Sequence, residues 1–240
     1  SDGRAQIVIG THAIIQEGVN FKNLGLVIID EQHRFGVLQR GELIKKAGET
    51  PNILVMSATP IPRTLSLSLY GDLDISVIDS LPKGRKTVRT AVRYDADMVK
   101  VYDFIKAEIQ SGRQVYIVYP LIEKSEKSDL QAANEGFEEL SKGVFSGIEM
   151  SLLTGKMKGD EKDGIMNRFK TGEIRLLIST TVIEVGVDNP NATVMLVMHS
   201  ERFGLSQLHQ LRGRVGRGQH QSYCIRSEEH TSELQSRQSI

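Results

Sequence analysis

The sequence predicts an α/β fold with two units, each a parallel sheet covered by helices, and two observations support this. Short apolar runs that suit buried strands alternate along the chain with longer amphipathic runs that suit helices. Polar residues directly follow several of these runs, and ligands of parallel sheets bind outside the carboxyl ends of the strands. The chain has 240 residues, of which 39% are hydrophobic, and this is enough for two small cores.

The first unit is predicted to cover residues 1–86. A helix from Val37 to Ala47 is expected to connect two of its strands, which then lie parallel and close together. The polar stretch from Ser80 to Lys86 suits a linker. Because an apolar run begins only a few residues after Ser1, we expect this domain to be truncated at its N-terminus. The expected strands are residues 7–10, 26–30, 53–57 and 75–78.

The second unit is predicted to cover residues 87–225. Its longest charged segment contains an amphipathic stretch around Phe137, and Cys224 lies in a strand-like stretch where we expect a buried, inert thiol. The other expected strands are residues 88–94, 114–119, 148–154, 174–179 and 192–199, and the expected helices are residues 96–111, 158–171 and 205–211.

Residues 226–240 are polar and lack hydrophobic periodicity. This segment is similar to the translation of a sequencing adapter, so we interpret it as a non-native tail. A natural disordered tail is the alternative interpretation.

The composition narrows the class of protein. A formal net charge of zero gives no global sign of a polyanionic partner, so any such site must come from local clusters. One cysteine excludes a disulfide framework and favours a reducing compartment. No apolar run approaches the ~18 residues of a membrane span. We therefore expect a cytoplasmic protein with no membrane partner. A monomer is a separate expectation, which the composition does not address.

Two carboxylates, Asp30 and Glu31, follow the apolar run that ends at Ile29. Magnesium prefers hard oxygen ligands and keeps much of its water, which suits Asp30. Glu31 is then placed to orient or deprotonate a water that attacks a phosphate. The alternative is an exposed acidic turn after a core strand.

Two hydroxyls, Ser57 and Thr59, follow the next apolar run in the same way. If the two runs are neighbouring parallel strands, the hydroxyls and the acid pair share one edge of the sheet. The alternative is that these hydroxyls only cap a turn or a helix.

A glycine-rich basic segment, residues 213–218, follows the predicted helix that carries Gln210. Arg214 and Arg217 are three residues apart, so on a helical turn both guanidinium groups project to one side. Guanidinium groups suit phosphate oxygens better than lysine does. The alternative for Arg217 is a surface loop that binds the phosphates of a nucleic acid.

Hydroxyls and a glycine also follow the strand that ends at Ser179. Such groups at a strand end fit contacts with a nucleic-acid backbone or a nucleotide ribose. A tight turn capped by Asp188 is the alternative, and isolated arginines such as Arg202 and Arg212 are candidates for further phosphate contacts. The residues concerned are Thr180, Thr181, Gly186 and Asp188.

The order of these motifs resembles the superfamily 2 helicases, and within them most closely the RecG family of branch-migrating DNA helicases. The resemblance extends over nearly all of residues 1–225, and His33 with the four residues after it favours RecG. The matching stretches are residues 9–13, 29–37, 56–65, 179–188 and 207–218.

The resemblance implies two RecA-like domains of the P-loop NTPase type that use ATP and Mg²⁺ and act on branched or forked DNA. By the same resemblance, Asp30, Glu31 and His33 act in hydrolysis, and Arg214 and Arg217 act as arginine fingers.

The resemblance also implies further roles. Ser57 and Thr59 are implied to couple nucleotide state to domain movement. Nucleotide contacts are implied for Gln210, Gly186 and Asp188, and nucleic-acid contacts for Thr11, His12, Arg63, Thr180 and Thr181.

Two other functions stay open at this point. One is a duplex-DNA translocase of the transcription-repair coupling type, and the other is an inactive nucleic-acid-binding remnant of the same scaffold. No phosphate-binding loop of the Gly-x-x-x-x-Gly-Lys-Ser/Thr type occurs in the sequence. We therefore expect the 240-residue chain to hydrolyse ATP negligibly by itself, and its full-length parent to be the enzyme.

Overall fold

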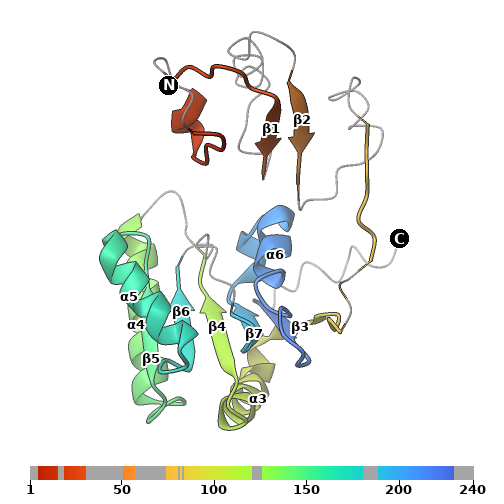
Figure 1. The fold of residues 1–240 in the computed structure, drawn as a ribbon. Helices are drawn as coiled ribbons and strands as arrows, with labels where there is room; N and C mark the ends of the chain where they lie inside the picture. Colours follow the sequence, from red (N-terminus) through yellow and green to blue (C-terminus); the bar gives the residue numbers. More distant parts are fainter. Residues whose placement is uncertain are drawn as a thin grey trace. The chain divides into compact units, whose positions relative to one another are not determined.

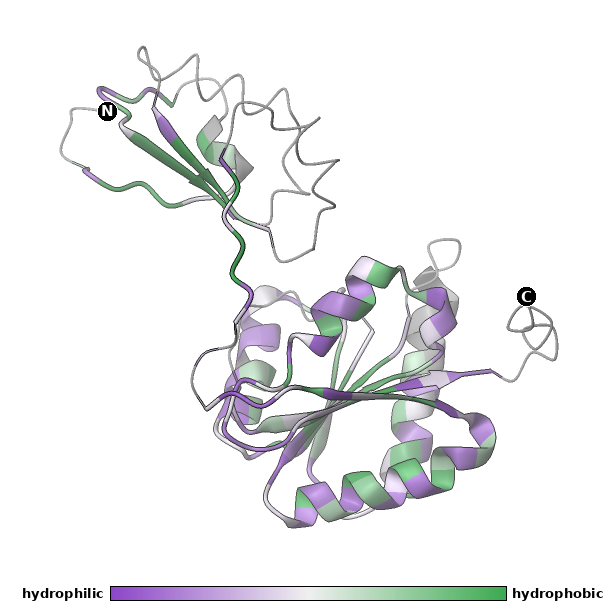
Figure 2. Cartoon of the chain, turned by 90° about the vertical axis from the view of Figure 1, so that its right-hand side faces the viewer, coloured by the Kyte–Doolittle hydropathy of each residue, from purple (hydrophilic) through white to green (hydrophobic). Residues whose placement is uncertain are grey.

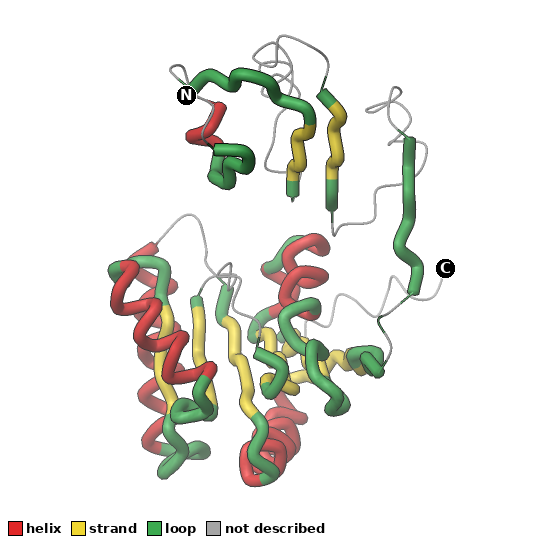
Figure 3. The backbone as a smooth tube through the Cα atoms, in the orientation of Figure 1, coloured by secondary structure: helices red, strands yellow, loops and turns green. Residues whose placement is uncertain are grey.

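The chain divides into two compact units, Ser1–Ile75 and Ser76–Ile240, which are described separately (Figure 1). The computed structural model describes residues 5–15, 19–30, 51–57, 74–80, 82, 84–120, 126–180 and 189–229. Figure 3 shows these residues as helix, strand or loop. The domain boundary expected after residue 86 stays a prediction.

The smaller unit contains two parallel strands, β1 (Leu26–Ile29) and β2 (Asn52–Val55). Side chains of β1 alternate between exposed and buried, and its two buried residues form a small core with partly buried neighbours such as Ile14 and Ile53. A short 3-10 helix, η1 (His12–Ile15), precedes the strands. The parallel pairing confirms the sequence prediction, whereas the crossover helix expected at 37–47 lies outside the described residues.

Two expected strands of the first domain are wrong. Residues 7–10 and 75–78 have irregular backbone, and their apolar side chains are exposed, with Ile9 92% and Ile78 93% exposed. A strand requires a neighbour for its backbone hydrogen bonds. In the described part of the smaller unit, β1 and β2 pair only with each other.

The larger unit is a six-stranded parallel sheet with the order β3-β8-β7-β4-β6-β5. Its strands are β3 (Arg89–Tyr94), β4 (Gln114–Val118), β5 (Met150–Leu153), β6 (Leu176–Ser179), β7 (Ala192–Val197) and β8 (Tyr223–Glu228). Its helices are η3 (Asp95–Asp97), α3 (Met98–Gln110), α4 (Glu126–Lys142), α5 (Gly159–Lys170), η4 (Ser200–Arg202) and α6 (Leu205–Arg212). These elements confirm the predicted α/β alternation.

Helices cover both faces of this sheet. One core joins α3 and α4 to alternate residues of the strands, such as Ile117 of β4. The other joins α5 and α6 to the residues in between, such as Tyr116. Because β4, β6 and β7 are buried on both faces, they form continuous apolar runs in the sequence, as central parallel strands do. In Figure 2 the helices carry both apolar and polar colours, as this packing requires.

A buried polar side chain holds the start of β4. Gln114 is 1% exposed. Its amide nitrogen donates to the carbonyls of Phe169 and Ile174, and its amide oxygen accepts from the side-chain nitrogens of Asn189 (3.2 Å) and Asn191 (3.3 Å). Gln114 therefore ties the end of α5 and the approach to β6 to the segment that leads into β7.

The last strand extends past the boundary expected at residue 225. β8 pairs with β3 along its full length, so its residues 226–228 have ladder partners in Val92, Arg93 and Tyr94. These three residues of the expected tail therefore belong to the sheet, and the non-native origin of residues 226–240 stays a prediction. In the described part of the chain, no helix has the length and apolar character needed to cross a membrane.

Candidate functional site

Asp30 and Ser57 lie at the same edge of the small sheet. Asp30 follows β1 directly, Ser57 follows β2 after one residue, and the strands pair in parallel with Ile29 opposite Val55. The amide of Met56 donates to the carbonyl of Ile29 (2.8 Å), which extends the ladder up to this edge. The structure thus confirms that these two groups emerge together, and both residues are exposed.

An exposed carboxylate beside a hydroxyl at the carboxyl edge of a parallel sheet is suited to a hydrated magnesium ion. Asp30 has the position and the oxygen ligands for this role. The neighbouring predicted residues, Glu31, His33, Thr59 and Arg63, lie outside the described residues, so their roles stay predictions.

Thr11 and His12 lie at the beginning of η1. The carbonyl of Thr11 accepts a hydrogen bond from the amide of Ile14 (3.1 Å), which closes the turn. Thr11 is exposed and is therefore accessible to a polymer backbone. Its predicted contact with nucleic acid is compatible with this position.

The helical turn expected for Arg214 and Arg217 is wrong. The helix α6 ends at Arg212, and Gly213 follows as its C-cap. Gly216, between the two arginines, has a φ of 78°, a left-handed conformation that glycine adopts without strain. The two arginines therefore lie on an irregular loop, and their spacing of three residues does not place them on one side of a helical turn.

Arg217 lines a cavity of about 700 Å³ next to this loop. Its Nε donates to the carbonyl of Gly213 (3.2 Å), and both Arg214 and Arg217 are half-buried. Basic and amide side chains dominate the polar part of the cavity wall. They are Arg85, Asn191, Arg217, Gln219 and His220.

The other predicted residues of the larger unit differ in accessibility. Gln210 is half-buried on α6. Thr180, directly after β6, is 2% exposed, and its hydroxyl has no hydrogen-bond partner among the described residues. In this conformation the hydroxyl of Thr180 is buried and not accessible to a nucleic acid. Its nucleic-acid contact stays a prediction. Thr181, Gly186 and Asp188 lie outside the described residues.

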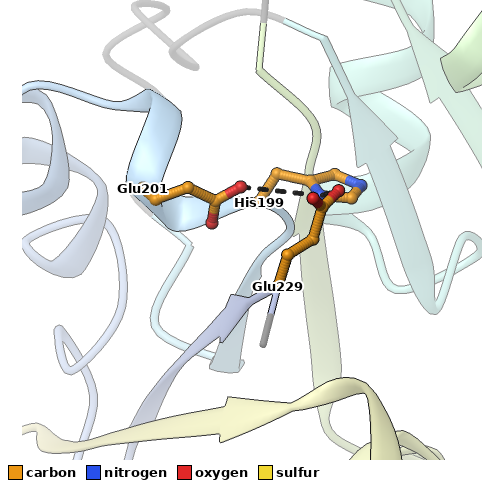
Figure 4. Close-up of side chains that lie close together, drawn as sticks. All are labelled: His199, Glu201 and Glu229. Atoms are coloured by element: carbon orange, nitrogen blue, oxygen red, sulfur yellow. Dashed lines mark ion pairs between the residues drawn. The ribbon is translucent and has the colours of Figure 1, made fainter. Parts of the chain in front are cut away.

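Sequence reasoning missed a cluster of ionisable groups at the end of β7 (Figure 4). Nδ1 of His199 lies 3.2 Å from a carboxylate oxygen of Glu229 and 3.8 Å from one of Glu201. Such atoms are able to ligate a metal, but Arg202 lies 3.7 Å from both carboxylates. Because the guanidinium offsets part of their negative charge and the imidazole of His199 also lies against both carboxylates, we interpret the group as an ion-pair cluster. Glu229 belongs to the segment 226–240 that we interpret from its sequence as a non-native tail, so the cluster was not predicted.

A second cavity, of about 460 Å³, lies between α4 and the ends of β4 and β7. Burial, followed by Tyr102 and Glu139, raises the pKa of Tyr119, so this phenol is neutral at physiological pH. Gly136 of α4 faces it, since a Cβ there would lie 2.6 Å from the hydroxyl oxygen of Tyr119. This close approach accounts for a glycine within a helix, where glycine otherwise costs about 1 kcal/mol.

The thiol of Cys224 is buried, as the sequence predicted. Burial raises its pKa to about 11, with a smaller opposing effect of Arg226. Thiolate, not thiol, is the reactive form. Cys224 is therefore a structural residue of β8.

Comparison with known proteins places the chain in a family. The model of the helicase conserved C-terminal domain matches residues 97–219, and the model of the DEAD/DEAH box helicase matches residues 2–67. The chain belongs to the helicase conserved C-terminal domain family. The match extends from α3 to the arginine-bearing loop and so contains Gln210, Arg214 and Arg217.

Individual relatives confirm the expected resemblance to RecG within superfamily 2. The chain is 54% identical to the ATP-dependent DNA helicase RecG of Synechocystis sp. and 55% identical to that of Thermotoga maritima, over 94% and 93% of its length. It spans 27% and 29% of the length of those proteins.

Solved structures agree with this assignment. A structure of RecG bound to a three-way DNA junction has a TM-score of 0.72 and 49% identity, and the match covers 96% of this chain and 29% of that one. The Mycobacterium smegmatis helicase Lhr, solved with single-stranded DNA and AMP-PNP, has a TM-score of 0.60 at 17% identity over 88% of this chain and 29% of its own. The second likeness supports the fold alone, and it confirms the RecA-like parallel-sheet architecture.

Proposed function

We propose that the full-length protein that carries this chain is an ATP-dependent DNA helicase that remodels branched DNA and stalled replication forks in recombination and repair. The observation that carries this proposal is the identity of 49–55% to RecG proteins over 93–96% of the chain. One of these relatives was solved on a three-way DNA junction. DNA of this shape is therefore the substrate class that we propose.

The smaller unit supplies the groups for hydrolysis in this proposal. Asp30 holds a hydrated Mg²⁺ at the edge where Ser57 also emerges, and Glu31 orients the water that attacks the γ-phosphate of ATP. Phosphoryl transfer needs little covalent chemistry from a protein, so catalysis depends on positioning and electrostatics. The shared edge of β1 and β2 supports this positioning, because the backbone ladder fixes the places from which the side chains of Asp30 and Ser57 extend.

Arg214 and Arg217 stabilise the charge on the transferring phosphoryl group. Guanidinium groups remain charged at any physiological pH and match phosphate oxygens with several donors. An arginine that acts in this way is worth ~10³-fold or more in rate. The fixed loop and the cavity beside Arg217 support this role, because an arginine finger must be held in place and must be accessible.

The decisive experiment uses the full-length protein and measures ATP turnover with single-stranded, linear duplex and forked DNA. The Glu31→Gln variant should lose turnover by at least ~10²-fold, the usual contribution of a general base, and should retain ATP binding. Glu161→Gln, an exposed residue in the first turn of α5, is the matched control and should behave as the parent. Chelation of Mg²⁺ with EDTA should abolish turnover.

The outcomes separate the three functions. Turnover stimulated by forked DNA, with unwinding, supports the proposal. Stimulation by linear duplex without strand separation indicates a translocase of the transcription-repair type instead. Absence of DNA-stimulated turnover in the parent indicates a binding remnant, and full activity of Glu31→Gln contradicts the role of Glu31.

A further inference from the structure

The segment before β3 runs alongside the loop that carries Arg214 and Arg217. We call residues 84–88 the linker segment and residues 213–222 the arginine loop. Nε of Arg85 donates to the carbonyl of Gly216 (2.8 Å). Next to it, the side chain of Gln221 donates to the carbonyl of Thr87 (2.9 Å). These two contacts attach the arginine loop to the linker segment, and the pairing of β3 with β8 begins directly after them.

Close packing reinforces the attachment at Gly216. A Cβ at this position would lie 2.5 Å from Cγ2 of Val88, so the loop backbone lies directly against the linker segment. Val88 itself packs on the core that contains Val215. On its other flank the loop approaches Pro190, whose carbonyl would collide with any Cβ at Gly218. The arginine loop is therefore held between two backbone segments.

Arg85 makes the first of these polar contacts from an exposed position. A guanidinium donating to a carbonyl is a charge-assisted bond and is stronger than a neutral one. The accepting residue, Gly216, lies between Arg214 and Arg217 in the chain, so the bond fixes the backbone between the two arginines. Arg85 and Arg217 also line the same cavity. A change at Arg85 therefore acts first on the position of the backbone from which Arg217 extends.

We propose that Arg85 is a positioning residue for ATP hydrolysis, which holds the arginine loop so that Arg214 and Arg217 meet the transferring phosphoryl group. This inference rests on the proposed function of those two arginines. Arg85 contacts the loop backbone and does not itself need to touch nucleotide. Through Arg85 the linker segment is attached to the residues that stabilise the transition state.

The test compares variants of the full-length protein in DNA-stimulated ATP turnover. Arg85→Ala should lower kcat by about tenfold to hundredfold with KM for ATP within about twofold, because a misplacement of about 1 Å costs on the order of 10²-fold. Arg85→Lys, which can still donate one hydrogen bond, should recover part of the loss. Arg93→Ala is the matched control, since exposed Arg93 of β3 donates to the carbonyl of its neighbour Val92 (2.7 Å), and should leave kcat unchanged.

Hydrogen exchange gives a readout that is independent of turnover. Amides of the arginine loop should exchange faster in Arg85→Ala than in the parent, whereas Arg93→Ala should leave them as they are. If Arg85→Ala raises KM alone, or lowers kcat without faster exchange in the loop, the positioning role is wrong. If Arg217→Ala loses turnover while Arg85→Ala keeps it, the inference fails and the proposed function stands. If Arg217→Ala keeps full turnover, the arginine-finger role fails as well.

Discussion

Substitution of Gln114 by leucine should lower the free energy of unfolding of the larger unit by about 3 kcal/mol, because it orphans buried polar groups. The side chain makes four hydrogen bonds with its surroundings. Two of the partners stay satisfied without it. The carbonyl of Phe169 also accepts from the amide of Gly172 (3.0 Å), and the side chain of Asn191 also donates to the carbonyl of Gly112 (2.9 Å).

The carbonyl of Ile174 and the side-chain nitrogen of Asn189 lose the partner that Gln114 provides. Each such buried group costs about 1–3 kcal/mol when left unpaired. The added apolar contact of leucine offsets roughly 1 kcal/mol, as about one further buried methylene would. The net loss is then about 1–5 kcal/mol, with a central value of about 3 kcal/mol.

The assay is urea unfolding of the 240-residue chain followed by far-ultraviolet circular dichroism, with Tm as a second measure. A loss of this size should lower Tm by about 6–12 °C for a unit of this length. The control is Gln110→Leu, the exposed last residue of α3, which should stay within about 0.5 kcal/mol of the parent. A Gln114→Leu variant that loses less than about 1 kcal/mol would refute the argument from orphaned groups.

Two further predictions concern Gly216 and Cys224. Gly216→Ala should lower the free energy of unfolding by about 2–4 kcal/mol, because an L residue is strained at this left-handed φ and the alanine Cβ meets Val88. Urea unfolding measures this loss, and an unchanged unfolding midpoint would contradict it. The thiol of Cys224 should resist iodoacetamide at pH 8 in the folded chain and react after unfolding in urea, as mass spectrometry will show. Because burial raises its pKa from 9.0 to about 11, the unfolded thiol ionises first. The stability that the neutral thiol contributes is therefore complete below about pH 9 and is lost as the pH rises through about 11; Cys224→Ala should lack this part of the pH dependence.

The sequence predicted the larger unit well because three of its strands, β4, β6 and β7, are buried on both faces of the sheet. Parallel strands covered on both faces must be apolar at nearly every position, so runs such as Val115–Val118 stand out from their polar surroundings. The helices between them show amphipathic periodicity because each packs one side on the sheet. Burial leaves a clear pattern in the sequence, and this pattern locates an element even when its partners are unknown.

Strand pairing and backbone conformation leave a weaker pattern in the sequence than burial does. Residues 7–10 and 75–78 are as apolar as the true strands, but hydrophobicity does not reveal whether a neighbouring strand exists. Residues 226–228 are polar and nevertheless extend β8, because ladder hydrogen bonds use the backbone and not the side chains. The spacing of Arg214 and Arg217 suggested a helical turn, whereas the helix ends before Gly213 and the backbone turns left-handed at Gly216.

The candidate site was predictable where a motif directly follows a strand. Asp30 and Ser57 were predicted to share one edge of the sheet, and this prediction required only that two apolar runs form neighbouring parallel strands. The strands β1 and β2 meet this condition. Contacts between distant segments were not predictable in this way. The bond from Arg85 to Gly216 joins residues 131 positions apart, and no local pattern marks either residue as a partner of the other.

The place of β8 in the sheet has a consequence for biosynthesis. This strand is made after the other five, yet it separates β3 from β7. Until residues 223–228 have left the ribosome, β3 lacks the neighbour to which it bonds in the final sheet, and β7 presents an open edge. Open edges invite pairing with other chains, and such exposed intermediates aggregate readily. Completion of β8 closes both of these edges at once, because it pairs with β3 on one side and with β7 on the other.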